Sequence, residues 1–250
     1  MKIIVISDIH GNAYSLAYLL PELRREVADQ IVCLGDAVQG GAQPAETVAL
    51  LRELACPVVM GNADAWMLTG VETDGGTIPE SRKQRLNAVR DWSLSQLSED
   101  DRAFIAAFQP TVEIPLGDGR NLLCFHGSPT SFDDILLPST PDADFDAQLA
   151  PYQPSILTGG HTHMQQIRRI GAGESFFFNP GSVGFAYTHY QPDGSFHADA
   201  WAEYAVLTVQ NGRIGLEFRR VPYDAATLIE IYRSSGRPHA DEALEQYQRA

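Results

Sequence analysis

The sequence predicts an α/β fold in four layers, an α/β/β/α sandwich of two stacked mixed β-sheets flanked by helices. The first 60 residues alternate short apolar runs with helical patterns, an order that favours parallel strands. Beyond residue 110 the apolar runs come in pairs joined by glycine-containing turns, which indicates antiparallel strands. We therefore expect parallel pairs mainly in one sheet and antiparallel pairs mainly in the other.

The elements of the first part follow from the spacing of apolar residues. Strands are predicted at 3–7, 31–35 and 57–61, each short, apolar and followed by a polar residue. A helix is predicted over 14–23, and Pro21 is expected to end or kink it early. Pro44 fits the first turn of a second helix, which precedes the third strand.

The second part begins with helices and continues with hairpins. Residues 80 to 108 have a helical pattern, within which Ser98 and Asp101 form a capping-box motif that opens a second helix. Hairpin turns are predicted at 117–120, at 171–173 and at Asn211-Gly212, the dipeptide best suited to a type I′ turn.

Length and composition set the expected domain organisation. With 250 residues, 44% of them hydrophobic, the chain is expected to form a single domain over 1–250. A surface excursion is expected at about 129–154, which is rich in proline, aspartate and serine, and a helical tail from about 224. No apolar stretch approaches the ~18–20 residues that cross a bilayer, and the first apolar run is too short for a secretory signal. Three cysteines, interpreted as buried thiols, favour a cytoplasmic location.

The net charge of −14 narrows the possible partners. Binding to nucleic acid or to an anionic membrane normally relies on Lys and Arg that neutralise phosphates, so both are excluded as expected partners. A small phosphorylated substrate remains possible if the site itself reverses the local charge. The oligomeric state is left open, and a homo-oligomer is compatible with the sequence.

Metal-binding side chains follow several of the predicted strands. Asp8 and His10 lie two residues apart at a strand end, which places both side chains on one side, and His161 and His163 repeat this spacing. Other candidates follow strand-terminal residues, namely Asp36, Asn62 and His126. Carboxylate and imidazole groups without thiolates suit Mn²⁺, Fe, Ni²⁺ or Zn²⁺. Because ligands of open α/β sheets bind beyond the carboxyl ends of the strands, these side chains are expected to meet in one site.

At these residues the chain resembles the calcineurin-like metallophosphoesterase superfamily. The matching blocks, in order, are Asp8-Ile9-His10, Gly35-Asp36, Gly61-Asn62-Ala63-Asp64, His126-Gly127 and Gly160-His161-Thr162-His163. The later block Asn179-Pro180-Gly181-Ser182-Val183-Gly184 resembles the small bacterial and archaeal phosphodiesterase branch. The resemblance covers roughly residues 1–220.

The resemblance implies a centre of two divalent metal ions, with manganese first and iron, nickel or zinc as alternatives. By position, one metal would bind Asp8, His10, Asp36 and His163, and the other Asp36, Asn62, His126 and His161. Asp36 would bridge the two ions. The implied function is a phosphoesterase that hydrolyses small phosphodiesters or phosphomonoesters with a metal-activated hydroxide. Asp36, Asn62 and His126 would be its catalytic residues.

One position departs from the pattern of the superfamily. Many members have a histidine after the Asn, which is thought to protonate the leaving group, and here the residue is Ala63. Loss of a general acid typically costs ~10²–10⁴-fold in rate, so reactive esters are expected to be cleaved more readily than alkyl esters. His189 is a candidate substitute, and Asn12, Asn62 and His189 are the candidate substrate contacts.

Structural alternatives stand beside these roles. Asp8 and Asp36 could cap helices, Asn12 could be a helix N-cap, and 179–182 could be only a turn. Two other functions also remain open. One is a protein phosphatase or dinucleoside polyphosphate hydrolase, against which Ala63 argues. The other is a non-catalytic binding scaffold on the same fold, resembling the retromer subunit of this superfamily.

Overall fold

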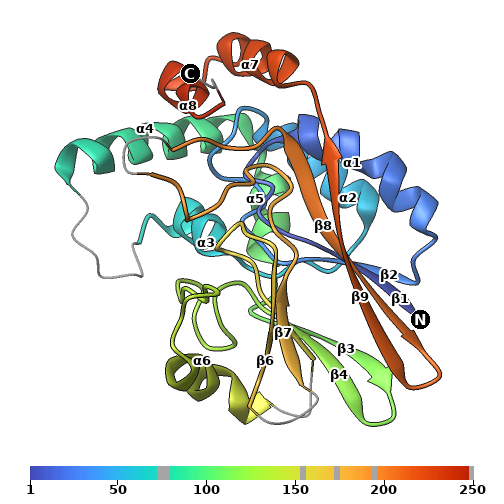
Figure 1. The fold of residues 1–250 in the computed structure, drawn as a ribbon. Helices are drawn as coiled ribbons and strands as arrows, with labels where there is room; N and C mark the ends of the chain where they lie inside the picture. Colours follow the sequence, from blue (N-terminus) through green and yellow to red (C-terminus); the bar gives the residue numbers. More distant parts are fainter. Residues whose placement is uncertain (72–78, 153–155, 172–174, 193–195, 248–250) are drawn as a thin grey trace.

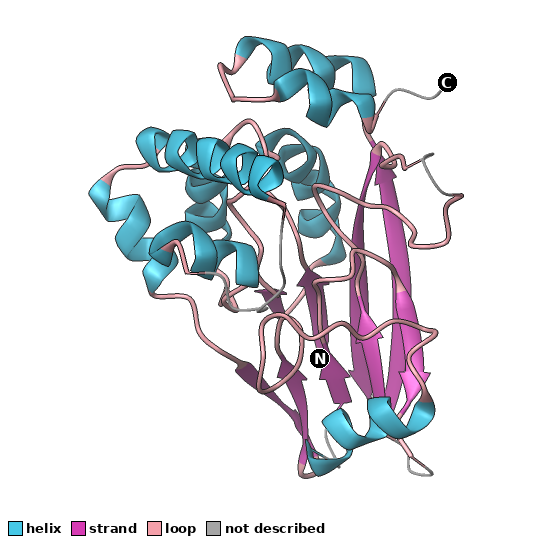
Figure 2. Ribbon diagram, turned by 90° about the vertical axis from the view of Figure 1, so that its left-hand side faces the viewer, coloured by secondary structure: helices cyan, strands magenta, loops and turns pink. Residues whose placement is uncertain are grey.

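The computed structural model describes residues 1–71, 79–152, 156–171, 175–192 and 196–247. Figures 1 and 2 show two β-sheets, with most helices gathered along one side of the strands. The first sheet contains β1 (Lys2–Ile6), β2 (Gln30–Cys33), β8 (Trp201–Gln210) and β9 (Arg213–Pro222), in the order β2-β1-β8-β9.

The second sheet has the strand order β3-β4-β5-β7-β6. Its strands are β3 (Val112–Gly117), β4 (Arg120–Cys124), β5 (Ile156–Thr158), β6 (Gln166–Arg169) and β7 (Phe176–Asn179). Both sheets are mixed, which confirms the predicted architecture. The expected separation of pair types is wrong, because β4, β5 and β7 are parallel in the second sheet while β8 joins β1 antiparallel in the first.

The period of two along β1 divides the core into two layers. Ile3 and Val5 point toward the second sheet and join the apolar cluster between the two sheets. Ile4 and Ile6 point the other way and pack against the helices. A strand that is apolar on both faces must be covered on both faces, which is why the first sheet lies in the middle of the molecule.

Helices cover the outer faces of both sheets. Those that follow the strands of the first part or precede β3 are α1 (Ala13–Glu26), α2 (Pro44–Leu54), α3 (Asn62–Thr69), α4 (Glu80–Gln96) and α5 (Glu99–Ala106). On the second sheet, α6 (Asp142–Leu149) and the 3₁₀ turn Ala150–Tyr152 contribute to a cluster in which Phe145 packs edge-on against Phe177. The chain ends with α7 (Ala225–Ser234) and α8 (Ala240–Glu245), which lie beyond the upper end of β9 in Figure 1.

Two expected elements differ in the structure. The run 57–61 forms no extended strand and makes only isolated bridges, Cys33 to Val58 and Val59 to Gln109. Pro21 lies inside α1 and does not end it. An interior proline costs about 3 kcal/mol, and the burial of the opposite face of α1, including Leu16 and Leu19, offsets that cost.

The turn chemistry confirms several other predictions. Asn211 and Gly212 have φ angles of 52° and 73°, as a type I′ turn requires. Ser98 and Asp101 form the capping box at the start of α5. The hairpins β3–β4 and β6–β7 are both present, although residues 172–173 of the second turn lie outside the described residues.

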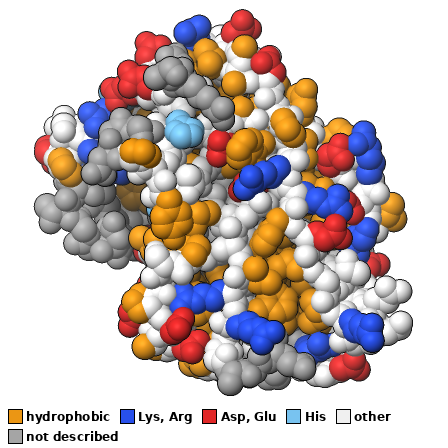
Figure 3. Space-filling view, viewed as in Figure 1, with side chains coloured by type: hydrophobic (Ala, Val, Ile, Leu, Met, Phe, Trp, Pro, Cys, Tyr) orange, Lys and Arg blue, Asp and Glu red, His pale blue; other side chains and the backbone are white. Residues whose placement is uncertain are grey.

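The expected excursion at 129–154 contains α6, and its residues 153–154 lie outside the described part of the chain. Within the described ranges, no helix combines the length and apolar character that a bilayer span requires. Figure 3 shows an apolar area in the middle of one face, with Lys and Arg side chains around it.

Candidate dimetal centre

The predicted ligands lie at the ends of strands, where the chain turns sharply. Asp8 follows β1, Asp36 follows β2 and His126 follows β4, and all three are buried. Ten non-glycine residues among those described have a left-handed backbone, and five of them are predicted ligands: Asp8, His10, Asp36, His161 and His163. Backbone strain of this kind costs about 1–2 kcal/mol per residue and is concentrated at functional sites.

The first group of ligand atoms comes from Asp8, His10 and His163. One atom from each side chain lies within 4.8 Å of the others. The Oδ1 atom of Asp8 is 3.4 Å from Nε2 of His163 and 3.8 Å from Nε2 of His10. The two histidine Nε2 atoms are 3.1 Å apart.

The second group comes from Asp36, His126 and His161 and meets the same distance limit. The Oδ2 atom of Asp36 is 3.4 Å from Nε2 of His126 and 3.7 Å from Nε2 of His10. Asp36 therefore reaches both groups. The amide oxygen of Asn62 lies 3.0 Å from Nε2 of His126, which adds the seventh predicted ligand to this group.

Backbone carbonyls orient three of the four histidines. The Nδ1 atoms of His10, His126 and His163 lie 2.9, 2.8 and 2.6 Å from the carbonyl oxygens of Gln39, Leu34 and Phe185. A carbonyl only accepts, so each Nδ1 carries the proton and donates it. When the ring is neutral, its Nε2 lone pair points into the centre.

Several polar atoms of the centre face one another without a proton between them. The Nε2 lone pairs of His10 and His163 oppose each other at 3.1 Å, and Oδ1 of Asp8 is buried with no hydrogen-bond partner. Such contacts are unfavourable between protein groups alone, and a cation held between them would satisfy each one. The donor set of carboxylates, imidazoles and one amide fits two divalent ions.

The pKa shifts of His126 and Asp36 also indicate that a positive charge is favourable in this centre. Burial opposes protonation of His126, but the carboxylates of Asp36 and Asp8 raise its pKa to about 10. Burial also opposes ionisation of Asp36, yet the contact with His126 brings the pKa of that carboxyl well below its usual range. Burial lowers the pKa of His161 to about 4, so this ring is neutral and free to coordinate. A metal ion would take the place of the proton on His126.

Two glycines leave room for the ligands. A Cβ on Gly61 would overlap Oδ1 of Asp36, and a Cβ on Gly160 would overlap the side chain of Ser7 beside Asp8. The glycines that precede Asn62 and His161 are therefore required by close approach.

The block 179–182 fastens two ligand-bearing loops together. The side-chain amide of Asn179 donates to the carbonyl of Gly160 at 2.6 Å, directly before His161. The hydroxyl of Ser182 donates to the carbonyl of Asp8 at 2.7 Å. These contacts give the block a supporting role in the site in addition to its turn.

Asp64 contributes to the centre in a way that sequence reasoning missed. Its buried carboxylate accepts hydrogen bonds from the backbone N–H groups of Ala37 and Val38, which follow Asp36. Burial and the nearby Asp36 raise the pKa of Asp64 to about 6. The available signal was its position in the sequence. An aspartate two residues after the predicted ligand Asn62 lies close enough to support the metal site.

The candidate substrate contacts Asn12 and His189 lie in different surroundings. The side chain of Asn12 caps α1 by accepting from Ser15 at 3.1 Å, and it donates to the carbonyl of Gly184 at 3.0 Å. His189 is exposed, with Nε2 3.0 Å from the carbonyl of Thr162, between the ligands His161 and His163. At position 63 the contact with the ligands comes from the backbone, since the N–H of Ala63 donates to Oδ1 of Asp36 at 2.8 Å.

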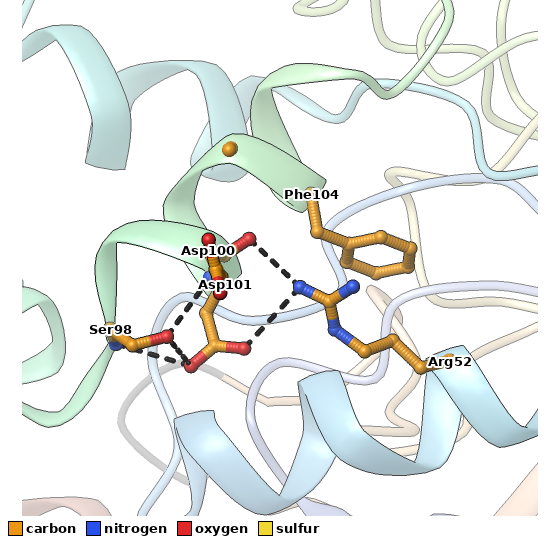
Figure 4. A pocket seen from close by; sticks show the side chains of 6 residues that line it. Arg52, Ser98, Asp100, Asp101 and Phe104 are labelled. Carbon is orange, nitrogen blue, oxygen red and sulfur yellow. Dashed lines mark hydrogen bonds and ion pairs between the residues drawn. The ribbon is translucent and has the colours of Figure 1, made fainter.

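A surface pocket of about 580 Å³ lies between α2 and the start of α5. Its lining residues include none of the two ligand groups. Figure 4 shows Arg52 lying over the ring of Phe104 and pointing toward Asp100 and Asp101. The guanidinium of Arg52 donates to the carbonyl of Asp100 at 2.8 Å and lies 3.5 Å from the carboxylate of Asp101. These contacts fasten α2 to the first turn of α5.

The chain also matches known proteins over most of its length. Residues 1–212 match the calcineurin-like phosphoesterase superfamily domain. The chain is 27% identical over 243 residues to the uncharacterized protein MJ0912 of Methanocaldococcus jannaschii, covering 91% of this chain and 90% of that protein.

Two solved structures share the fold over nearly the whole chain. A metallophosphoesterase from Sphaerobacter thermophilus is 24% identical, with a TM-score of 0.69 and coverage of 98% of this chain and 97% of the other. The hypothetical protein PH1004 from Pyrococcus horikoshii is 20% identical, with a TM-score of 0.78 and coverage of 100% and 99%. The two-sheet architecture is therefore shared with known structures.

Proposed function

This chain belongs to the calcineurin-like phosphoesterase superfamily, and on that premise we propose that it is a dimetal-dependent hydrolase of small phosphodiesters or phosphomonoesters. The observation that carries the proposal is the pair of ligand groups that share Asp36. When bound there, two divalent ions would neutralise the phosphoryl oxygens and lower the pKa of a bound water.

The chain's own residues prepare the site for this chemistry. The three carbonyl-bound histidines present fixed lone pairs, so little reorganisation is needed when the ligands act. Four histidines and the amide of Asn62 add no negative charge, and only Asp8 and Asp36 do, so the loaded centre would stay positive and attract a phosphate. Manganese is the proposed metal, with iron, nickel or zinc as alternatives.

Substrate preference follows from Ala63. The residue after Asn62 carries no acid, and the carboxylate of Asp64 in α3 is engaged by the N–H groups of Ala37 and Val38, so a good leaving group is favoured over an alkoxide. We infer that small, reactive phosphate esters are the substrates, that the protein acts in the cytoplasm, and that neither nucleic acid nor membrane is a partner.

The decisive assay uses metal-free protein reloaded with Mn²⁺ and bis-p-nitrophenyl phosphate as substrate. Asp36→Asn should reduce kcat/KM by about 100-fold or more, because a shared ligand loses its charge. Asp118→Asn, in the exposed β3–β4 turn, is the matched control and should match the wild type. An inactive wild type, or an Asp36→Asn variant with full activity, would contradict the proposal.

The alternative functions separate in the same experiment. A panel of phosphopeptides and dinucleoside polyphosphates assayed beside the diester would reveal a protein phosphatase or polyphosphate hydrolase. A binding scaffold would show substoichiometric metal and no turnover on any of these esters.

A further inference from the structure

The C-terminal tail, residues 223–247, lies beyond the residues that match the superfamily domain, yet it packs against loops of the metal centre. Its buried side chains form one apolar cluster with residues from those loops and from α1. The cluster contains Tyr223, Leu228, Tyr232, Leu244 and Tyr247 of the tail, with Ala42, Ala198, Tyr14 and Phe185.

Tyr247 reaches the loop that orients His163. Its hydroxyl donates to the carbonyl of Gly184 at 3.2 Å, in a buried position. The N–H of Gly184 donates to the carbonyl of Asp8 at 3.0 Å. The next residue, Phe185, supplies the carbonyl that accepts from Nδ1 of His163. The same carbonyl of Gly184 accepts from the side-chain amide of Asn12 at 3.0 Å, so the tail hydroxyl and Asn12 together hold a short segment between two ligands of the first metal group.

Arg237 reaches the loop that orients His10. Its Nε donates to the carbonyl of Gly40 at 2.7 Å, next to Gln39, whose carbonyl accepts from Nδ1 of His10. The rest of the guanidinium donates to the carbonyls of Pro238 and His239 and lies over the ring of Tyr232. Among the described residues no carboxylate lies within ion-pair distance of Arg237, so its guanidinium is committed to backbone carbonyls.

The two contacts favour one metal group over the other. Both end one residue away from a carbonyl that orients a histidine of the first group, Asp8, His10 and His163. In the second group the corresponding acceptor is Leu34, and no hydrogen bond from the described tail residues reaches it. This difference predicts that the tail contacts affect the ion of the first group and not that of the second.

We propose that Tyr247 and Arg237 are positioning residues that fix the imidazoles of His163 and His10, so that the C-terminal tail sets the affinity of the first metal site without touching the second. This inference rests on the proposed dimetal function. Partners that orient metal-bound histidines typically contribute 10–100-fold to metal affinity. The tail residues act through one further residue. We therefore expect each of them to change the metal affinity by about tenfold, the lower end of that range.

The test is calorimetric titration of Mn²⁺ into metal-free full-length protein. Tyr247→Phe and Arg237→Lys should each raise the Kd of one site by about tenfold and leave the other unchanged. Tyr232→Phe removes a hydroxyl from the same cluster but keeps the ring under Arg237, and should leave both sites unchanged. Arg233→Lys, in the last turn of α7, is the control for Arg237→Lys.

The identity of the affected site comes from combined variants. With His126→Ala, which damages the second group, Tyr247→Phe should still weaken the remaining ion. With His163→Ala, which damages the first group, Tyr247→Phe should have no further effect. Equal weakening of both sites, or unchanged binding in both tail variants, would overturn the inference.

A measurement on metal-free protein separates this inference from the proposed function. The Nδ1 protons of His10 and His163 should exchange with solvent faster in Tyr247→Phe and Arg237→Lys than in the wild type, as followed by NMR, whereas that of His126 should not change. If the wild type binds no Mn²⁺, the proposed function fails. If the wild type binds two ions and the exchange rates are identical in all variants, only the role of the tail fails.

Discussion

At the scale of residues, the centre consists of polar and charged side chains whose burial is unfavourable unless they are paired. Asp8, Asp36 and Asp64 are all carboxylates with exposures of 3% or less, and three of the four ligand histidines have their outer nitrogen committed to a carbonyl. The hydrogen bonds from the backbone to Asp64 hold the turn after Asp36. The geometry is therefore prepared before any ligand arrives.

Glu203 gives a pH-dependent prediction at the same scale. This carboxyl on β8 accepts from Nε1 of Trp201 and Nε of Arg220, but burial raises its pKa to about 7, from 4.5. Between these values the folded chain keeps a proton that the unfolded chain has released, so stability falls as pH rises from about 4.5 to 7. A shift of this size corresponds to about 3 kcal/mol.

Denaturant titrations at pH 5 and pH 8 measure this contribution. The free energy of unfolding of wild type should fall by about 2.5 kcal/mol more than that of Glu203→Gln between pH 5 and pH 8. Glu217→Gln, an exposed position on β9, should follow the wild type. Parallel pH profiles of wild type and Glu203→Gln would exclude the predicted role.

At the scale of elements, strand ends bring the ligands together. Asp36, which lies near both ligand groups, follows β2 in the first sheet, whereas His126 and His161 follow β4 and β5 in the second. Because the sheets stack face to face, their corresponding ends converge. The β8–β9 hairpin completes the first sheet, and the backbone N–H of Glu203 on β8 donates to the carbonyl of Ser182 in the supporting loop.

The turn of this hairpin can be tested with a pair of glycines. Gly212 has a φ of 73°, so Gly212→Ala should lower the free energy of unfolding by about 1–2 kcal/mol through backbone strain. Gly215, three residues later on β9, has open space around it and no positive φ, so Gly215→Ala should change stability little. Urea unfolding of both variants gives the comparison, and equal effects would contradict the turn assignment.

At the scale of the whole molecule, the chain is strongly negative, whereas a centre that binds phosphate must be positive. A net charge of −14 favours solubility and repels polyanions, while the cluster of Asp8 and Asp36 attracts cations before it can attract phosphate. Metal binding should therefore be linked to the stability of the fold, because the unfolded chain has no such cluster.

Metal removal measures that linkage. At a Mn²⁺ concentration 100 times Kd, each site should add about 2.7 kcal/mol to the free energy of unfolding, and a chelator should remove it. Thermal unfolding with and without EDTA reports the difference as a fall in Tm. Asp36→Asn should show a much smaller fall, since its sites are damaged. An identical response in wild type and Asp36→Asn would mean that the stabilising ion binds elsewhere.

Much of this arrangement could be predicted from the sequence. The seven predicted ligands stood out because each block joins an apolar run to a residue that can coordinate a metal, and the hairpin at Asn211-Gly212 follows from local turn chemistry. The expected end of the helix at Pro21 was wrong, because local propensity ignores the buried face that lets α1 continue through the proline. The prediction of a strand at 57–61 was wrong because an apolar run indicates burial but does not specify which strand it would pair with.

The sequence by itself determined which side chains can coordinate a metal and which strand ends carry them, since both are properties of a few adjacent residues. Only the tertiary structure decided that β8 and β9 would pair beside β1, that Asp64 would hold the turn after Asp36, and that Tyr247 would reach Gly184. The physical reason is distance along the chain: contacts between segments that are far apart in sequence depend on how whole faces pack, and no local pattern encodes that packing.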